Sequence, residues 1–319
     1  MERIQMALEK ARAKRASSAG AAPTASDPAQ PPSQTANHTA TTAATAKPAV
    51  RNGPASATIT EIAPPAPAPT AAPAPAPGEL SAEIRTRWET LPVFSPKPSL
   101  MAHHRLIGFS GGREAGPIDM MRTKILQEMR KNGWRRLAIT SPNPGCGKTT
   151  TALNLAFSLG RQANQRTVVA DLDMRRPGMA RMLGLQAGHR FARVIAGEVP
   201  AQEHMVRYGT NLAFGTSETP ARNPAELLQG ASIGPALTQI ETDYAATVMI
   251  FDMPPMMMSD DMMAFAPHVD CVLLLAGAET TSMDDLDRCE RELAGVTNVL
   301  GVVLNKCRYM EPGYGYGYY

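Results

Sequence analysis

The sequence predicts an α/β fold with a doubly wound, mostly parallel sheet, and three observations support this prediction. From about residue 100 onward, apolar strand-like runs alternate with helical segments. These runs are apolar on both faces rather than alternating with polar residues, as strands are when helices cover both faces of a parallel sheet. A glycine-rich turn at 141–147 separates the first run from a helix, which is a common arrangement for binding anions. Residues 100–308 are therefore expected to form one domain with a well-buried core.

At least six strands are predicted, and each is a short apolar run that ends ahead of a helix or turn. They are RLAIT at 136–140, TVVADLD at 167–173, NLAFG at 211–215, TVMIFDM at 247–253, DCVLLLAGA at 270–278 and VLGVVLN at 299–305. The first strand precedes a helix at about 147–160. Asn223 and Pro224 are typical of a helix cap and first helical position, and the segments DDMMAFA and SMDDLDRCERELA are predicted helices.

Two segments precede this domain. Residues 1–16 predict a basic amphipathic helix, because Ile4, Leu8 and Ala11 share one face. This helix is either a docking arm for a partner or acidic lipid heads, or a solvated and frayed terminus. Residues 17–99 are predicted to be a disordered linker, because Ala, Pro, Thr and Ser dominate as far as residue 79 and offer little apolar surface to bury.

Composition excludes some classes of protein and leaves others open. The 319 residues carry a formal net charge of +3, which argues neither for nor against a nucleic-acid partner. No apolar run is long enough to span a bilayer, and no apolar core follows the charged N-terminus, so neither a spanning helix nor a secretory signal is predicted. The four cysteines form no CxxC pair and no evident disulfide framework, which fits a reducing, cytosolic location.

The strongest chemical signal is SPNPGCGKTT, which begins at Ser141. Its order of strand, glycine-rich turn and helix is that of a phosphate-binding loop of the P-loop NTPase type. Lys148 would reach the β and γ phosphates, and the Thr149 hydroxyl would hold Mg²⁺. The pattern GxxxxGK[ST] begins with glycine, and here Pro142 takes that place; the alternative is a chance Gly-Lys-Thr at a helix start. The predicted nucleotide-binding residues of the loop are Pro144, Gly145, Cys146, Gly147, Lys148, Thr149 and Thr150.

Three carboxylates lie at the ends of predicted strands. Asp171 and Asp173 end one strand, and Asp252 ends another. Parallel strands of a doubly wound sheet deliver their carboxyl ends to one edge, where ligands bind. A single aspartate in such a place is usually a helix cap. Three of them beside a phosphate loop predict a site that handles a metal and a nucleophile, since Mg²⁺ takes oxygen ligands.

Together, SPNPGCGKTT, VVADLDMRRPGM, VMIFDMPPMMMSDD and the tyrosine-rich C-terminus resemble the bacterial tyrosine kinases (BY-kinases) of capsule and exopolysaccharide assembly. The resemblance covers about residues 100–319. Its more specific elements are Asp171-x-Asp173-x-Arg175 and the Asp-x-Pro-Pro that begins at Asp252. It implies an ATP- and Mg²⁺-dependent autokinase that regulates the polymerisation and export of the polysaccharide.

The resemblance also implies roles for individual residues. Lys148, Asp171, Asp173 and Asp252 would be catalytic, with Thr149, Asp171 and Asp252 at the metal. Either Asp171 or Asp173 would accept the proton of the tyrosine hydroxyl, and the sequence does not decide between them. Arg175 or Arg176 would stabilise developing charge or be simply solvated. Asn305 would contact adenine.

The tail 309–319 is the expected substrate, and four of its last six residues are tyrosine. The predicted phosphoacceptors are Tyr314, Tyr316, Tyr318 and Tyr319. If the last strand is parallel, the chain leaves the sheet at the nucleotide edge. About 13 extended residues then reach roughly 40 Å, enough to enter a neighbouring copy and act in trans. The alternative is a sticky or frayed end.

Partners are implied by the resemblance alone. They are a homo-oligomer, either ring or dimer, a separate membrane protein that regulates chain length and activates the kinase, and a cognate phosphatase; no nucleic acid is implied. The chain would be cytoplasmic and recruited through that partner to the inner face of the plasma membrane. The family's oligomer motif, ExxRxxR, matches Asp119 and Arg122, but Ile125 replaces its second arginine. The ring interface is therefore open to question.

Two other functions remain open. A ParA/MinD-like partitioning or placement ATPase would share the fold, since fold does not fix function. Such ATPases usually carry a second lysine early in the loop, where this chain has Asn143. The other candidate is a non-catalytic scaffold that docks through its two terminal segments.

Overall fold

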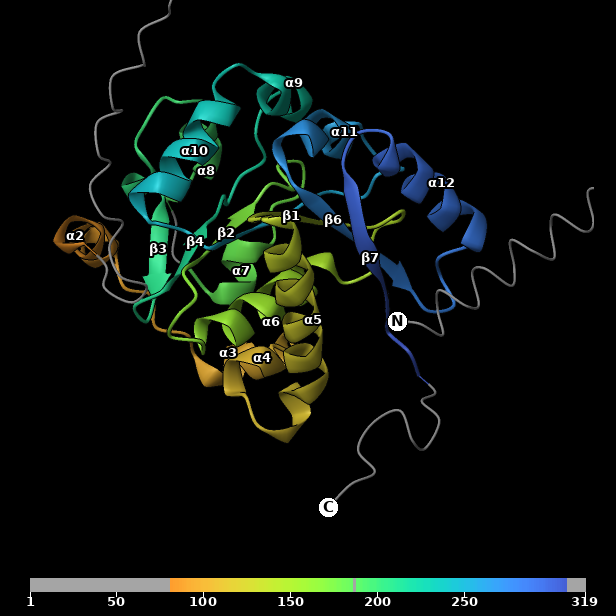
Figure 1. Ribbon diagram of the computed structural model, residues 1–319, viewed down its shortest axis with the longest axis horizontal. Coiled ribbons are helices and arrows are strands. Elements are labelled where there is room, and N and C mark those ends of the chain that lie inside the picture. The colour runs from red at the N-terminus through yellow and green to blue at the C-terminus, as the bar shows by residue number, and fades with distance from the viewer. Residues whose placement is uncertain (1–80, 186–187, 309–319) are drawn as a thin grey trace, which may run out of the picture. The chain divides into compact units, whose positions relative to one another are not determined.

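The computed structural model describes residues 81–308, apart from 186–187 (Figure 1). The described residues all belong to one compact unit, Ala71–Tyr319. The predicted N-terminal helix, the predicted linker up to residue 80 and the tyrosine tail lie outside the described residues. None of the described helices is long and apolar enough to cross a membrane.

A seven-stranded sheet forms the centre of the unit, in the order β3-β4-β2-β5-β1-β6-β7. Every neighbouring pair is parallel except β3 and β4, so the predicted mostly parallel sheet is confirmed. All six predicted strands are present, and β3 is an additional antiparallel edge strand. The strands are β1 Arg136–Thr140, β2 Thr167–Asp171, β3 Met205–Tyr208, β4 Leu212–Gly215, β5 Val248–Asp252, β6 Cys271–Gly277 and β7 Asn298–Asn305.

Helices cover both faces of the sheet (Figure 1). Those that share one apolar cluster with the sheet are α3 Pro98–His103, α5 Gly116–Asn132, α6 Lys148–Gly160 and α7 Met179–Leu183, with α4 Ile107–Ser110 beside α6. Those on the other face are α2 Ala82–Thr90, α8 Phe191–Ile195, α9 Pro224–Gln229, α10 Ile233–Asp243, α11 Asp261–Phe265 and α12 Met283–Ala294. Short 3₁₀ turns occupy Arg113–Ala115, Ala201–Glu203 and Ala266–His268.

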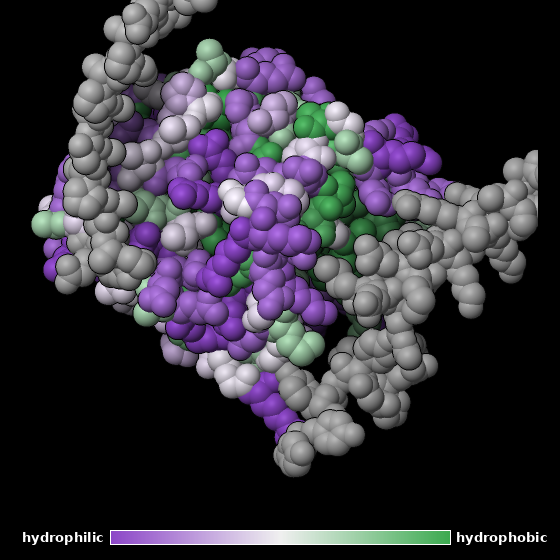
Figure 2. All heavy atoms as spheres, in the orientation of Figure 1, coloured by the Kyte–Doolittle hydropathy of each residue, from purple (hydrophilic) through white to green (hydrophobic). Residues whose placement is uncertain are grey.

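Alternate residues of the central strands supply the two cores. In β5, Met249 and Phe251 join the cluster under α10, while Val248 and Ile250 join the cluster under α6. This is the two-residue period of a strand with both faces buried. β7 is an edge strand, and its apolar side chains are mostly half-buried. Figure 2 shows hydrophobic residues gathered where Figure 1 places β6 and β7, on a surface that is otherwise mostly hydrophilic.

The folded unit begins earlier than the sequence predicted. Residues 17–99 were expected to be linker, but helix α2 lies within that range and buries Trp88. The Trp88 indole donates a 3.0 Å hydrogen bond to the Tyr244 carbonyl and packs edge-to-face on the Tyr244 ring at 5.6 Å. The prediction was wrong from residue 81 onward, because one large aromatic anchors a helix that is otherwise mostly polar or charged.

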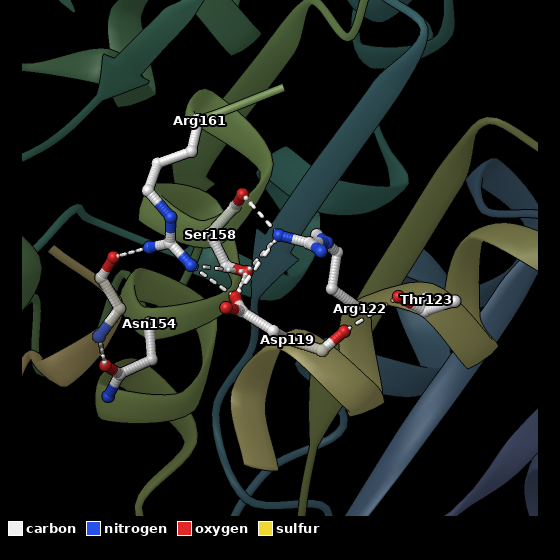
Figure 3. Close-up of polar contacts among 7 residues, drawn as sticks. Asp119, Arg122, Thr123, Asn154, Ser158 and Arg161 are labelled. Atoms are coloured by element: carbon white, nitrogen blue, oxygen red, sulfur yellow. Dashed lines mark hydrogen bonds and ion pairs between the residues drawn. The ribbon is translucent and has the colours of Figure 1, made fainter. Parts of the chain in front are cut away.

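The predicted oligomer motif lies on α5 and faces α6 (Figure 3). The Asp119 carboxylate accepts hydrogen bonds from Ser158 and Arg161. Arg122 donates to Asp119 at 3.2 Å and to the Ser158 hydroxyl at 3.0 Å. Ile125, which replaces the second arginine, is buried in the apolar cluster under α6. The acid and arginine of the motif therefore pair within this chain, and a ring interface through them stays a prediction.

Candidate active site

The phosphate-binding loop lies between β1 and α6, at the carboxyl edge of the sheet. Gly145 and Gly147 have φ of 80° and 92°, a left-handed conformation that favours glycine. A Cβ atom at Gly147 would lie 2.4 Å from the Asn305 side-chain amide, so another residue there would have a strained φ and would displace Asn305. The Asn305 Nδ2 donates a 2.8 Å hydrogen bond to the Cys146 carbonyl. The end of β7 thus supports the loop directly.

Pro142, where the usual pattern has glycine, is compatible with this loop. Its carbonyl accepts a 3.1 Å hydrogen bond from the Met257 N–H, and the preceding Ser141 carbonyl accepts one from Met256 at 2.9 Å. Pro142 is not among the residues with positive φ, so the conformation does not require glycine there. The departure from the pattern leaves the cradle intact.

A pocket of about 390 Å³ opens beside the loop. Lys148, at the first position of α6, lines it together with Asp173 and Arg176. Loop residues Pro144 and Gly145 form one wall, and Pro254 and Pro255 form another. The pocket therefore joins the phosphate-binding loop to the ends of β2 and β5.

The structure brings the three predicted carboxylates to this edge. Asp171 and Asp252 are register partners at the ends of the neighbouring strands β2 and β5, and both are almost completely buried. The Asp171 Oδ2 accepts hydrogen bonds from the Gly178 and Met179 N–H groups at 3.1 and 3.0 Å, so it caps the start of α7. Asp173 is only half-buried and lines the pocket.

Burial is the main cause of unusual pKa values in this group. It raises the pKa of Asp252 to about 7, against the opposing effects of the Thr149 hydroxyl and the Lys148 charge. Burial and then the nearby Asp252 charge raise the pKa of Asp171 well above its usual value. Burial also raises the pKa of Asp173, and Lys148 opposes it. Together, these carboxylates are poorly stabilised in their charged form unless a cation joins them.

The residues present fit a bound Mg²⁺. Both oxygens of Asp252 and the Oδ1 of Asp171 are buried and form no well-aligned hydrogen bond, although the Thr149 hydroxyl is close enough to act on Asp252. Unpartnered buried carboxylate oxygens are costly, and oxygen ligands are what Mg²⁺ prefers. Within residues 81–185 and 188–308, no three His, Cys, Asp or Glu side chains are placed to hold a metal by themselves. Thr149, nucleotide phosphate and water would supply the other ligands.

Replacing Asp252 with asparagine is expected to stabilise the nucleotide-free protein at pH 8. The folded-state pKa of Asp252 lies above its ordinary value of 3.8, so its contribution to stability is full below about pH 4 and is lost as pH rises to about 7. Removing the charge should raise the free energy of unfolding by about 2–4 kcal/mol, or roughly 5–10 °C in Tm. Thermal denaturation without nucleotide measures this.

The same comparison at pH 5 should show a smaller difference, because the native carboxyl is then mostly protonated. Asp260→Asn is the control, since its side chain is 69% exposed and should leave Tm unchanged at both pH values. A lower Tm for Asp252→Asn at pH 8 would contradict the assignment of an unpaired buried charge.

An ion pair that the sequence did not reveal lies beside the site. Asp261 is completely buried and accepts two 2.8 Å hydrogen bonds from the Arg175 guanidinium. Arg175 is therefore held by the start of α11, and both Arg175 and Arg176 line the pocket. The only signal was the Ser-Asp-Asp at 259–261, and nothing in it indicated which arginine it meets.

The fold and site define a P-loop NTPase, and comparison with known families agrees. The chain belongs to the P-loop NTPase family whose model is described as ParA, NUBPL iron-transfer P-loop NTPase, which matches residues 134–316. This membership confirms the predicted fold type and supports the use of a nucleotide and Mg²⁺.

Individual relatives confirm the resemblance to the bacterial tyrosine kinases. The putative tyrosine-protein kinase AmsA of Erwinia amylovora is 25% identical over 221 residues, which cover 67% of this chain and 30% of that protein. Tyrosine-protein kinase CpsD of Streptococcus pneumoniae serotype 4 is 28% identical over 187 residues, covering 56% of this chain and 79% of CpsD. The crystal structure of the VpsO kinase domain is 26% identical with a TM-score of 0.54, covering 60% and 93%. This chain thus spans less than a third of the length of AmsA.

Proposed function

We propose that this chain is an ATP-dependent protein-tyrosine kinase that phosphorylates its own C-terminal tail. The acceptors are Tyr314, Tyr316, Tyr318 and Tyr319, and a neighbouring copy carries out the transfer. The observation that carries this proposal is the pocket in which a phosphate-binding loop faces half-buried Asp173, with Asp171 and Asp252 behind it. Two further features indicate that tyrosine is the acceptor. They are the similarity to tyrosine kinases and the tyrosine-rich tail.

In the proposed reaction, Lys148 neutralises the charge on the transferred phosphoryl group. Thr149, Asp171 and Asp252 hold Mg²⁺, which supplies further charge neutralisation when bound. The phenol oxygen of the tyrosine forms a bond to the γ-phosphorus of ATP, and the bond between that phosphorus and the β–γ bridging oxygen breaks. The phenol proton passes to Asp173, and ADP leaves.

Accessibility favours Asp173 over Asp171 as the base. Asp173 lines the pocket, whereas Asp171 is 1% exposed and uses one oxygen to cap α7. Burial raises the pKa of both carboxyls, which suits a base near neutral pH but does not distinguish the two residues. Asp171 would instead hold the metal beside Asp252.

The position of β7 supports delivery of the tail in trans. β7 is parallel to β6, and its last residue, Asn305, contacts the phosphate-binding loop. The chain therefore leaves the described fold at the nucleotide edge. From Asn305 to Tyr319 an extended chain spans about 45 Å, which is enough to reach the same edge of an adjacent copy.

The wider proposal places this kinase in capsule or exopolysaccharide polymerisation and export. A homo-oligomer would bring tail and site together, and a membrane chain-length regulator would recruit and activate the chain at the inner face of the plasma membrane. A cognate phosphatase would reverse the modification. Each phosphate adds about −1.5 to −2 charges, so a fully modified tail would repel itself and loosen the oligomer.

A placement ATPase remains the second candidate, because the matched family model carries the name ParA. The place of the second lysine of such enzymes is held here by Asn143, whose amide donates a 3.1 Å hydrogen bond to Asp285 on α12. Asn143 therefore offers no positive charge to a nucleotide, and its side-chain amide is already hydrogen-bonded to Asp285 of the same chain.

Incubating the purified chain with Mg-ATP distinguishes the candidates. Phosphotyrosine that depends on ATP indicates a kinase, and ATP turnover without phosphotyrosine indicates a placement ATPase. Neither signal, with or without membranes of the source organism, indicates a scaffold.

A further inference from the structure

A second pocket lies next to the turn that carries Asp173. Its volume is about 430 Å³, within the range of small-ligand sites. It is formed by α8, the loop that follows β4, and Leu227 of α9. The Ala221 N–H of that loop donates a 2.9 Å hydrogen bond to the carbonyl of Met174, the residue after Asp173. This pocket, called the α8 pocket below, is thus joined to the proposed active site by one backbone contact.

The α8 pocket is rich in positive charge. Arg190, Arg193 and Arg222 line it, and its single acid, Glu198, is paired with Arg193 at 2.9 Å. Among the described residues, the side chains of Arg190 and Arg222 form no ion pair. Guanidinium groups bind phosphate through paired charge-assisted hydrogen bonds. Two unpaired arginines therefore make a site for an anion.

The positive charge of these arginines also acts on the nearby His204 side chain. Burial lowers the pKa of His204, and the charges of Arg193 and Arg190 lower it further, with only Glu203 opposing. Two of the arginines are thus close enough to act on the same buried group. The cluster holds excess positive charge that an anion would relieve.

The rest of the lining is mostly apolar. Ala192, Ala196, Pro220, Ala221 and Leu227 also line the pocket, and Ser217 and Thr219 add hydroxyl groups. Such a surface suits a planar ring that carries a phosphate, because the ring would cover apolar side chains while the anion meets the guanidinium groups. The ligand class is therefore an aryl phosphate.

We propose that the α8 pocket binds a phosphotyrosine of the tail and holds it while another tyrosine of the same tail enters the active site. This inference rests on the proposed kinase function. Tyrosines separated by one glycine lie about 7 Å apart in an extended chain, so one tail can span neighbouring sites. A tail that is held in this pocket would stay beside the active site, so several of its tyrosines would be phosphorylated before the tail dissociates.

Peptide binding tests the pocket independently of catalysis. The protein is the full chain with Tyr309, Tyr314, Tyr316, Tyr318 and Tyr319 replaced by Phe, so that its own tail does not compete. Fluorescence anisotropy compares peptide 309–319 with and without a phosphate on Tyr316. The phosphorylated peptide should bind at least about 10-fold more tightly, since a charged hydrogen-bond pair contributes that much.

Arg190→Ala with Arg222→Ala should remove this preference, because both side chains are exposed and their loss leaves the core intact. Arg130→Ala, an exposed arginine on α5, is the matched control and should keep it. Phenyl phosphate should displace the phosphopeptide more effectively than inorganic phosphate does. If ATP displaces the phosphopeptide and phenyl phosphate does not, the pocket binds nucleotide and the proposal is overturned. Equal affinity for the two peptides, or an unchanged preference in the double variant, would overturn the proposal.

A kinetic readout separates this inference from the proposed function. With Mg-ATP, the double variant should form singly phosphorylated tails at the normal rate but accumulate few multiply phosphorylated ones. Unchanged proportions would overturn the pocket's role and leave the kinase intact. Absence of phosphotyrosine in the wild-type chain would instead refute the kinase, while the binding experiment would still report on the pocket.

Discussion

Replacing Lys148 with methionine is expected to lower phosphotyrosine formation on the tail by at least about 100-fold. Lys148 is 8% exposed, opens α6 and lines the pocket beside the phosphate-binding loop. Among the residues that the structure describes, its ammonium is the positive group that acts on Asp252, and it also acts on Asp173. Methionine keeps the approximate length and apolar stem of the side chain, so a lower rate would result from loss of the positive charge. Radiolabelled ATP with quantification of tail phosphotyrosine measures the effect.

Lys124→Met is the matched control, because it removes an exposed lysine from α5 and should leave labelling unchanged. Circular dichroism and thermal denaturation should show that Lys148→Met remains folded. Wild-type labelling by a folded Lys148→Met protein would show that the site has been wrongly assigned.

Replacing Asp173 with asparagine is expected to reduce tail phosphorylation by about 10²–10⁴-fold while ATP still binds. Asparagine has the same shape but accepts no proton, and the Arg176 N–H can still donate to its carbonyl oxygen as it does to Asp173 at 3.1 Å. A variant that loses phosphoryl transfer but still binds ATP identifies Asp173 as a base. A residue that only shapes the pocket would affect both quantities. Single-turnover labelling and nucleotide binding by fluorescence measure the two quantities.

Asp260→Asn is the local control for this change. Its exposed carboxylate lies 3.8 Å from Arg175, at the start of α11, and should have little effect on either quantity. Loss of ATP binding in Asp173→Asn, with transfer reduced in proportion, would assign Asp173 to the nucleotide instead. Transfer at the wild-type rate would exclude it as the base.

The strands were predictable where both of their faces are buried. β1, β2, β5 and β6 are apolar runs with no polar alternation, as expected for strands of a parallel sheet that is covered on both faces. β3 was not predicted, because this edge strand is only four residues long, and its half-buried second half carries the charged Arg207. Helix α2 was missed for a similar reason, since Trp88 is its only fully buried residue.

The part of the site that lies at the ends of strands was predictable from the sequence. Asp171 and Asp252 come together because the strands that carry them are neighbours, and the doubly wound topology requires this edge to be shared. The pairing of Arg175 with Asp261 was not predictable, because it depends on where α11 begins in space. The contact of Asn305 with the Cys146 carbonyl depends likewise on the position of β7 beside the loop. Local patterns carry no information on such contacts between distant segments.

Mass spectrometry of the tail tests the central claim most directly. Cleavage by trypsin after Arg308 releases the peptide YMEPGYGYGYY from the full chain. After incubation with Mg-ATP, with and without membranes of the source organism, this peptide should carry phosphate on Tyr314, Tyr316, Tyr318 and Tyr319. The amount should be small for the chain alone, larger with membranes, and absent in Lys148→Met. An unmodified peptide in both arms, or equal modification in Lys148→Met, would contradict a tyrosine kinase that acts on its own tail.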